Sequence, residues 1–301
     1  MATTASAPRI LILDNDETTG SYHLLFFIES FLNFAEQLGH SVDYNKTIQL
    51  IAAFCLESNI LRPGMQRFIR EAIRLKRARR IDKIVIYTNQ LSVAEEGFTW
   101  STPEMIADIL SLIADDPHFI DLLITRDSSA FAPQHHGYVI KDLVRPFTEL
   151  YPTKTPNFSK TLFIDDRAFN PYAHDSSRTN TSTNSFLAIP PYKNKLPYTA
   201  IVELCLQIMV VNNMRDTEDL ENAITLINRE WVHTNDSCPT MNDDPAILND
   251  ITKRLKQFYS KHSNVTTGSG YQQTRGKASQ ETGIEITRRQ TKRRSHPSPK
   301  T

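Results

Sequence analysis

The sequence predicts an α/β fold, a three-layer Rossmann-like arrangement in which helices lie on the faces of a parallel sheet. Short apolar runs recur as far as Pro190, and each is followed at once by polar or turn-forming residues, as expected of buried parallel strands. Segments with helical periodicity separate these runs, and such alternation is typical of a parallel sheet. After Pro190 only helical patterns follow, so we expect a helical C-terminal extension.

The predicted strands share an apolar stretch with a polar end. They are RILIL at 9–13, IVIY at 84–87, LLIT at 122–125, LFI at 162–164 and FLAI at 186–189. Ligands of open parallel sheets bind beyond the carboxyl ends of the strands. The polar residues that follow these runs are therefore the candidates for a functional site.

The predicted helices show apolar residues at helical spacing. They span 21–38, 45–57, 63–79 and 102–114 before the change of pattern, and 197–213, 216–232 and 245–261 after it. Pro63 and Gly64 open the third of these helices. In the fourth we expect Thr102 to be the N-cap and Pro103 to be the first helical residue, because both types are preferred there.

Composition and charge restrict the class of protein. The chain has 301 residues, of which 40% are hydrophobic, which is enough for a substantial core and excludes fibrous and fully disordered proteins. Lys and Arg balance Asp and Glu at 34 each, but residues 263–301 hold eight basic and two acidic residues. The body is therefore acidic, which argues against polyanion binding over its whole surface and directs any expected nucleic-acid contact to the tail.

The same patterns predict the organisation of the chain. We expect a flexible N-terminus at 1–8, an α/β domain at 9–190 with a helical insertion at about 20–60, a helical extension at 191–262 and a disordered basic tail at 263–301. The tail sequence RRQTKRRSHPSPK is typical either of a nuclear localisation signal or weak nucleic-acid contact, or of a solvated tail that aids solubility.

Three widely spaced cysteines and a start without a secretory signal favour a reduced protein of the cytoplasm or nucleus. The longest apolar stretches are too short to cross a bilayer, so we expect no membrane contact. Oligomeric state and host organism stay open.

Polar side chains with a common chemistry follow the predicted strands. Asp14, Asn15 and Asp16 come after the first strand, Thr88 and Asn89 after the second, Lys141 and Asp142 before the fourth, and Asp165 and Asp166 after it. If these segments meet at one edge of the sheet, they combine carboxylates, an ammonium and a hydroxyl. This combination suits Mg²⁺-dependent phosphoryl transfer, because Mg²⁺ prefers carboxylate oxygens. Each residue alone is also an ordinary turn or surface residue.

These motifs resemble those of the haloacid dehalogenase-like (HAD) phosphatases. ILILDNDETTG, IVIYTNQ, Lys141 and TLFIDDR match the order and type of that superfamily's four motifs. GYVIKDLVRP and RPGMQRFI are similar to the branch that contains the phosphatases of the RNA polymerase II carboxy-terminal domain, and DNDETTG is similar to members encoded by large DNA viruses. The resemblance covers about 9–190.

The resemblance implies a Mg²⁺-dependent phosphatase that hydrolyses a phosphomonoester through a phospho-aspartate intermediate. It implies that Asp14 is the nucleophile and that Asp16 is the general acid and base, with Thr18 supporting their loop. The implied phosphate-binding residues are Thr88, Asn89 and Lys141, and the implied Mg²⁺ ligands are Asp14, the main-chain oxygen of Asp16, and Asp166, with Asp165 either a further ligand or a partner of Lys141.

The resemblance leaves the substrate open, and a phosphoprotein, a nucleotide and a small metabolite are all compatible with it. The segment between Asn89 and Leu122 is too short for the β insertion of the carboxy-terminal domain phosphatases. The helices at 20–60 form either a cap over the site or packing on the flank of the sheet. The alternative function is a catalytically silent HAD-like binding or scaffold protein for a phosphorylated partner, and a third possibility is transfer to an acceptor other than water. The presence of both Asp14 and Asp16 favours catalysis.

Overall fold

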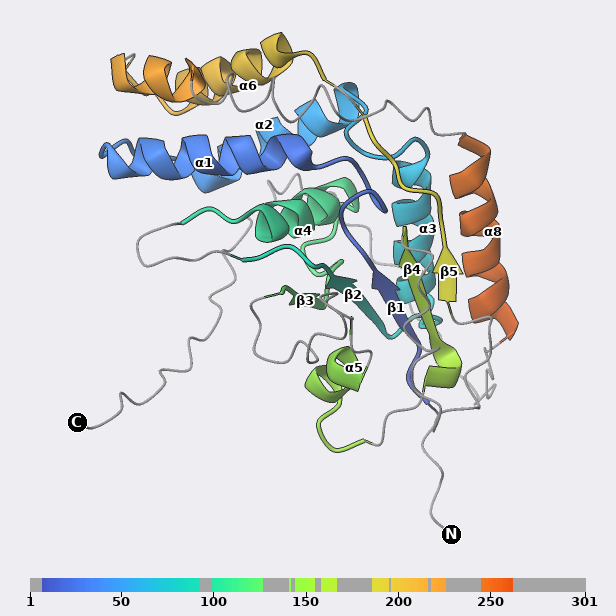
Figure 1. Ribbon diagram of the computed structural model, residues 1–301. Coiled ribbons are helices and arrows are strands. Elements are labelled where there is room, and N and C mark those ends of the chain that lie inside the picture. Colours follow the sequence, from blue (N-terminus) through green and yellow to red (C-terminus); the bar gives the residue numbers. More distant parts are fainter. Residues whose placement is uncertain are drawn as a thin grey trace, which may run out of the picture. The chain divides into compact units, whose positions relative to one another are not determined.

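A five-stranded sheet in which all strands are parallel forms the centre of the computed structural model (Figure 1). The strands are β1 (Ile10–Leu13), β2 (Lys83–Tyr87), β3 (Leu122–Ile124), β4 (Thr161–Asp165) and β5 (Phe186–Ala188), and their order across the sheet is β3-β2-β1-β4-β5. The predicted α/β class and the five predicted strands are therefore confirmed.

The structure describes residues 7–92, 99–126, 141, 144–154, 158–166, 186–194, 196–215, 218–225 and 245–261. The basic tail at 263–301 and most of the N-terminus at 1–8 lie outside these residues, so those two predictions stay predictions. Among the described residues, no helix combines the length and the apolar composition that a membrane span requires.

The central strand β1 is buried on both faces of the sheet. Leu11 and Leu13 point into one hydrophobic core, whereas Ile10 and Ile12 point into a second core on the opposite face. Alternate residues of a strand point to opposite faces, so a strand buried on both faces needs an unbroken apolar run. This requirement explains why the four residues ILIL read as a continuous run and not as an alternating pattern.

The larger core lies between one face of the sheet and most of the helices. It contains the buried faces of α3 (Met65–Arg77), α4 (Thr102–Ile113) and α8 (Pro245–Lys261). Helices α3 and α8 lie side by side (Figure 1). The hydroxyl of Tyr259 on α8 donates to the main-chain oxygen of Ile10 at 2.7 Å. The C-terminal helix therefore shares one core with the sheet.

The smaller core covers the opposite face. Phe147 of α5 (Val144–Leu150) and Phe158 of the short 3₁₀ helix Phe158–Lys160 pack there against Ile12, Tyr87 and neighbouring strand residues. The sequence analysis does not predict α5, because this helix has only seven residues and contains a proline.

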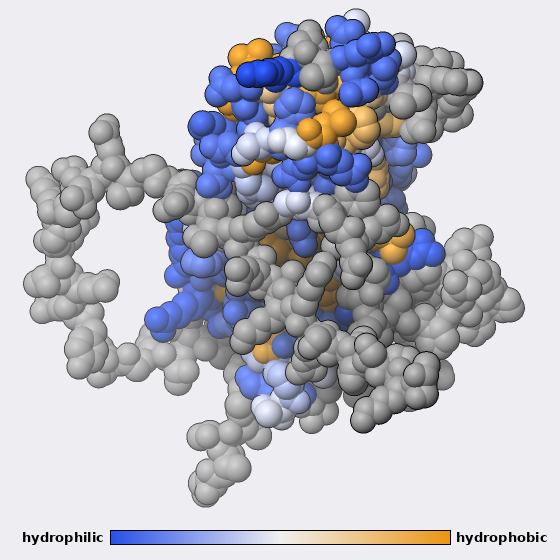
Figure 2. Space-filling view, turned by 90° about the vertical axis from the view of Figure 1, so that its left-hand side faces the viewer, coloured by the Kyte–Doolittle hydropathy of each residue, from blue (hydrophilic) through white to orange (hydrophobic). Residues whose placement is uncertain are grey.

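A further group of helices stacks on α4 (Figure 1). It consists of α1 (His23–Gln37) and α2 (Tyr44–Glu57) from the predicted insertion, together with α6 (Tyr198–Val211). Helix α2 contacts both α4 and α6, and α1 contacts the same two helices. The surface over this group is mostly hydrophilic, with smaller hydrophobic patches (Figure 2). Four large apolar side chains of this group are exposed. They are Phe26 of α1, Leu38 at the C-cap of α1, and Leu206 and Val210 of α6.

The start of α4 differs from the prediction by one residue. Ser101 is the N-cap, and Thr102, predicted as the cap, is the first helical residue. The reason is a partner from another helix: Oε2 of Glu29 on α1 accepts from the main-chain nitrogen of Thr102 at 2.7 Å and also from its hydroxyl. A carboxylate at a helix N-terminus satisfies unpaired amide groups and interacts favourably with the helix dipole. A distant side chain therefore performs the capping role here.

Candidate functional site

The carboxyl ends of β1, β2 and β4 bring three of the predicted motifs together. Asp14 follows β1 directly, Thr88 follows β2, and Asp165 is the last residue of β4. The main-chain nitrogen of Asp14 donates to the oxygen of Ile164 at 3.0 Å, so the first residue of the loop is still held by the sheet. Strand pairing therefore fixes where these side chains leave the sheet.

A polar pocket of about 310 Å³ opens at this edge. The residues that line it come from the loop after β1, the loop after β2 and the end of β4, and they are Asp14, Asp16, Glu17, Thr88, Asn89, Gln90 and Asp166. Five of the predicted site residues are in this set. Of the other three, Thr18 and Lys141 contact the lining residue Asp14, and Asp165 contacts Lys141.

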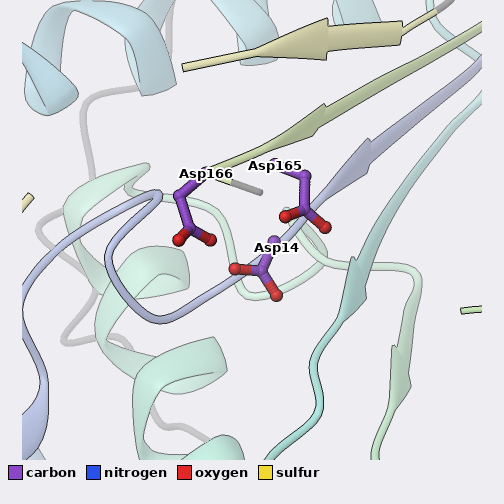
Figure 3. Close-up of side chains that lie close together, drawn as sticks. All are labelled: Asp14, Asp165 and Asp166. Carbon is purple, nitrogen blue, oxygen red and sulfur yellow. The ribbon is translucent and has the colours of Figure 1, made fainter. Parts of the chain in front are cut away.

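Asp14, Asp165 and Asp166 form a compact carboxylate cluster. One oxygen atom from each side chain lies within 4.8 Å of the others, and Figure 3 shows the three side chains approaching one another from the ends of β1 and β4. All three ligand atoms are hard carboxylate oxygens, which is the donor set that Mg²⁺ takes in proteins. The residues present therefore fit the magnesium ion that the resemblance implies.

Lys141 neutralises part of this charge from within the protein. Its ammonium group donates to Oδ1 of Asp14 and, at 2.8 Å, to Oδ2 of Asp165. The side chain is almost fully buried, and the ammonium lies 5.5 Å from the ring centre of Phe163, where a cation–π interaction adds stabilisation. Asp165 pairs with Lys141 and also belongs to the carboxylate cluster, so its position is compatible with both roles considered for it.

Thr18 connects the two sides of the cluster. Its hydroxyl lies 3.1 Å from Oδ2 of Asp14 and 3.3 Å from Oδ1 of Asp166. Since a hydroxyl carries one proton, it donates to one of these oxygens at a time. Thr18 is buried and lies between the first and the last motif, within hydrogen-bond distance of both.

The loop between Asp14 and Gly20 folds back on itself. The nitrogen of Glu17 donates to the oxygen of Gly20 at 2.8 Å, and the nitrogen of Thr19 donates to the oxygen of Asn15 at 2.9 Å. Glu17 has a φ of 57°, in the left-handed region that non-glycine residues seldom adopt. The turn directs Asp14 and Asp16 into the same pocket although they are separated by the buried Asn15.

The segment after β5 supports this loop from outside. The nitrogen of Tyr192 donates to the oxygen of Glu17 at 2.8 Å, and the ammonium of Lys193 lies 3.1 Å from Oε1 of the same glutamate. Nearby, the guanidinium of the buried Arg62 donates to the oxygen of Pro190, and its main-chain nitrogen donates to the oxygen of Thr19 at 3.1 Å. Two segments that are remote in sequence therefore hold the loop in place.

Burial raises the pKa of Asp14 to about 7, an effect that Lys141 opposes and that Asp165 and Asp166 reinforce. The pKa of Asp166 is also raised, first by burial and then by the charge of Asp165. Three carboxylates face the single ammonium of Lys141, so when all three are charged the cluster holds more negative charge than Lys141 offsets. A divalent cation favours the charged carboxylates and would remove this excess.

Asp16 lies outside the cluster but within the same pocket. Burial is the largest cause that raises its pKa, to about 6, and a hydrogen bond from the main-chain nitrogen of Tyr22 at 3.3 Å opposes the shift. A carboxyl group whose pKa is close to neutral can release and take up a proton at physiological pH, as general acid–base catalysis requires.

The predicted insertion begins beside the pocket but does not line its described part. Tyr22 contacts Asp16 just before α1 begins, and further along α1 Oδ1 of Asn33 accepts from the nitrogen of Trp100 at 2.9 Å. The lining includes no residue of α1 or α2 among those described. The described helices of the insertion pack on α4 and α6.

The sequence analysis misses three residues at the site. Gln90 and Glu17 line the pocket, and Lys193 pairs with Glu17. Gln90 follows Thr88 and Asn89 directly, so its position after a strand was a usable signal. No local pattern identifies Lys193, because its contact depends on the path of the chain after β5.

Comparisons with known proteins add no family assignment. The chain matches no protein-family model, and no curated protein matches it significantly. The chemistry of the site is therefore the basis of the functional conclusion that follows.

Proposed function

We propose that the protein is a Mg²⁺-dependent phosphatase of the haloacid dehalogenase-like type, which hydrolyses a phosphomonoester through a phospho-aspartate intermediate on Asp14. One observation carries the proposal: two buried members of a cluster of three carboxylates contact the ammonium of Lys141, and Asp16 opens into the same pocket. A nucleophile, a cation site and a proton donor are thus present within one pocket.

Asp14 performs the first displacement. A carboxylate oxygen of Asp14 attacks phosphorus, an oxygen–phosphorus bond forms, and the bond from phosphorus to the leaving oxygen breaks. The hydroxyl of Thr88, which lines the pocket, donates to a phosphoryl oxygen. Lys141 holds the Asp14 carboxylate in one orientation and offsets part of the negative charge that the phosphate brings to it.

Asp16 moves the proton in both half-reactions. In its protonated form it donates to the leaving oxygen, so the product departs as an alcohol. As a carboxylate it then removes a proton from the water that attacks the phospho-aspartate, and phosphate and free Asp14 are formed. Because the pKa of Asp16 is about 6, both forms are accessible near neutral pH.

Asp14, Asp165 and Asp166 are the side chains that would hold Mg²⁺. The ion supplies positive charge that reduces the repulsion between the Asp14 carboxylate and the phosphate dianion. Thr18 keeps Asp14 and Asp166 at a fixed distance and so preserves the arrangement of these ligands.

Substitution of the nucleophile tests the proposal. Asp14→Asn keeps the shape of the side chain but forms no acyl phosphate, so release of phosphate from p-nitrophenyl phosphate should fall by at least about 10²-fold, or about 3 kcal/mol in the barrier. Asp115→Asn, which changes an exposed aspartate after α4, is the matched control and should retain the wild-type rate. Equal rates for Asp14→Asn and wild type would contradict the assignment.

Removal of Mg²⁺ gives a second test with a readout other than turnover. Addition of Mg²⁺ to chelator-treated protein should raise the Tm, because a ligand that binds only the folded state stabilises it. Asp166→Asn removes one ligand and should abolish this rise, whereas Asp115→Asn should keep it. A Tm rise with no turnover of any phosphomonoester would instead support the alternative of a silent binding protein.

A further inference from the structure

A cluster of basic side chains covers the outer surface of α3 and α8. Arg67, Arg70, Arg74 and Arg77 on α3 are all exposed. Their spacings of three and four residues place them on one side of the helix. Lys253 and Lys256 lie three positions apart on α8, which packs against α3. These six residues are called the basic face below.

Contacts between the two helices show that these side chains belong to one surface. A guanidinium nitrogen of Arg67 donates to Oδ1 of Asn249 on α8 at 2.9 Å. Glu71 of α3 pairs with Arg74 at 2.5 Å and with Lys256 at 3.4 Å. Both partners of Glu71 are members of the basic face, so the face continues from one helix to the other.

Among the residues that the structure describes, few carboxylates offset the charge of the basic face. Glu71 is nearly buried between its two partners, and Asp116 lies 3.9 Å from Arg77. On α8, Asp250 lies three residues before Lys253 on the same side of the helix, but it pairs with Arg254 at 2.7 Å, an arginine outside the basic face. The basic face therefore keeps a net positive charge although the body of the chain is acidic.

We propose that the basic face binds the phosphate backbone of a nucleic-acid duplex without reading its sequence. Four of its six cations are arginines, whose planar guanidinium groups bind phosphate oxygens in pairs. From Arg67 to Arg77 the helix rises about 15 Å, so one helix presents its cations along a line to several successive phosphates. Such contacts supply affinity and carry no base specificity.

The side chains that α3 and α8 bury favour a nucleic-acid duplex over a single strand or a lipid bilayer as the partner of the basic face. The aromatic side chains of α3 and α8, Phe68, Phe258 and Tyr259, are buried in the core, so the basic face offers no ring on which an unpaired base could stack. The apolar residues of α3 also point into the core. The face therefore lacks the apolar surface with which an interfacial helix enters a lipid bilayer.

Charge removal on the full-length chain tests this proposal. The variant Arg67→Gln/Arg70→Gln/Arg77→Gln removes three exposed charges and leaves Arg74 paired with Glu71. The matched control, Lys46→Gln/Lys154→Gln/Arg215→Gln, removes three exposed charges from other parts of the chain. Fluorescence anisotropy with a labelled DNA duplex of mixed sequence, measured over a range of salt concentrations, gives the affinity and its salt dependence.

The arginine variant should bind the duplex at least about tenfold more weakly at low salt. The slope of log K against log salt concentration should become shallower by about 2 to 3, since each lost phosphate contact removes about 0.9 from it. The control should stay close to wild type. Unchanged affinity and slope in the arginine variant, or equal losses in the control, would assign binding to the tail or to general charge and overturn the proposal.

Three further experiments keep the outcome unambiguous. Thermal unfolding of both triple variants checks that the fold is intact, and the single charge reversal Arg70→Glu repeats the test with one exposed substitution. Vesicles that contain phosphatidylserine provide the competing surface. Loss of vesicle binding with retained duplex binding in the arginine variant would show that the basic face serves a membrane, against the proposal.

Discussion

At the scale of single residues, the orientation of the Asp14 carboxylate is set by two different donors. Lys141 donates to Oδ1, and Thr18 lies 3.1 Å from Oδ2. Since both oxygens have a partner, rotation of the carboxylate about its terminal bond would break a hydrogen bond in a buried site. A reacting group held in this way reaches its target with little loss of entropy at the moment of reaction.

The proposed role of Asp16 predicts a rate loss that depends on the leaving group. Asp16→Asn keeps the hydrogen bond from Tyr22 but cannot donate a carboxyl proton. With an alkyl phosphate, whose leaving oxygen is strongly basic, kcat/KM, which reports the steps up to departure of the leaving group, should fall by about 10²- to 10⁴-fold. With p-nitrophenyl phosphate, whose leaving group departs without protonation, the loss in kcat/KM should be much smaller.

Steady-state kinetics on both substrates checks this prediction. Glu36→Gln, which changes a carboxylate of α1 outside the pocket, serves as the control and should lower neither rate. An equal loss of kcat/KM on both substrates for Asp16→Asn would mean that Asp16 donates no proton to the leaving group.

The residues of the site were predictable where they directly follow a strand. Asp14, Thr88 and Asp166 each occupy such a position, and the parallel sheet brings these positions to one edge. The sequence analysis could not find Lys193, since its contact with Glu17 depends on where the chain passes after β5. A residue that directly follows a strand can be predicted from the local sequence. A residue such as Lys193, which reaches the site from a remote segment, is found only in the tertiary structure.

At the scale of secondary-structure elements, the loop after β1 fits tightly against the turn before α3. The nitrogen of Ser21 donates to the oxygen of Ile60 at 2.8 Å. A Cβ atom on Gly20 would lie 2.7 Å from that same oxygen and 2.8 Å from Cζ of Tyr22. The absence of a side chain at Gly20 is therefore what allows the two segments to approach.

Gly20→Ala should destabilise the protein and impair the site together. The added methyl group must displace either a main-chain oxygen or a buried tyrosine, at a cost of about 1–3 kcal/mol. Gly39→Ala is the control: its φ of 85° is also unfavourable for alanine, but no atom lies within 4 Å of the added Cβ.

Denaturant unfolding and phosphatase assays on both variants separate the two effects. Gly39→Ala should lose about 1–2 kcal/mol from backbone strain and keep its kcat. Gly20→Ala should lower kcat as well, because the displaced loop carries Asp14 and Asp16. A stable Gly20→Ala variant with normal kcat would mean that the loop has more freedom than this packing implies.

Elements with strong local signals were predictable, and short or externally capped ones were not. Helix α2 begins one residue before its predicted start at 45 and ends where predicted, and the side chain of Asp43 caps it by accepting from the nitrogen of Lys46. Helix α5 has too few residues to show a helical period. The start of α4 was displaced by one residue because its capping group, Glu29, comes from another helix.

At the scale of the whole molecule, Asp121 joins helix α3 to the edge of the sheet. Its Oδ2 accepts from the nitrogen of Ile84 at 2.8 Å and lies 2.7 Å from the ammonium of Lys76, and Lys83 donates to Oδ1 at 2.9 Å. Burial alone would raise the pKa of Asp121, but these three partners outweigh it, and the pKa lies below its usual value. The charged form therefore stabilises the fold.

This shift predicts how stability depends on pH. Because the folded pKa of Asp121 lies below the unfolded value, its contribution is complete above about pH 4. The contribution is lost as the pH falls through the folded pKa. Asp121→Asn should cost about 1–3 kcal/mol at neutral pH and should flatten the loss of stability below about pH 4.

Urea unfolding at several pH values measures both effects. Asp250→Asn, which removes an exposed carboxylate paired within α8, is the control and should cost less than about 0.5 kcal/mol. If Asp121→Asn and wild type lost stability in parallel as the pH falls, the acid sensitivity would come from other carboxylates.

The central position of β1 has a consequence for how the protein acquires its site. Ile10 pairs with Thr161, a residue about 150 positions later in the chain. During synthesis, β1 can gain β2 as a neighbour early, but its other edge stays without a partner until β4 has been made. Contacts between such distant residues close slowly. Asp14 therefore meets Asp165 and Asp166 only late in folding, and a nascent chain that ends before β4 carries the nucleophile without the rest of its cluster.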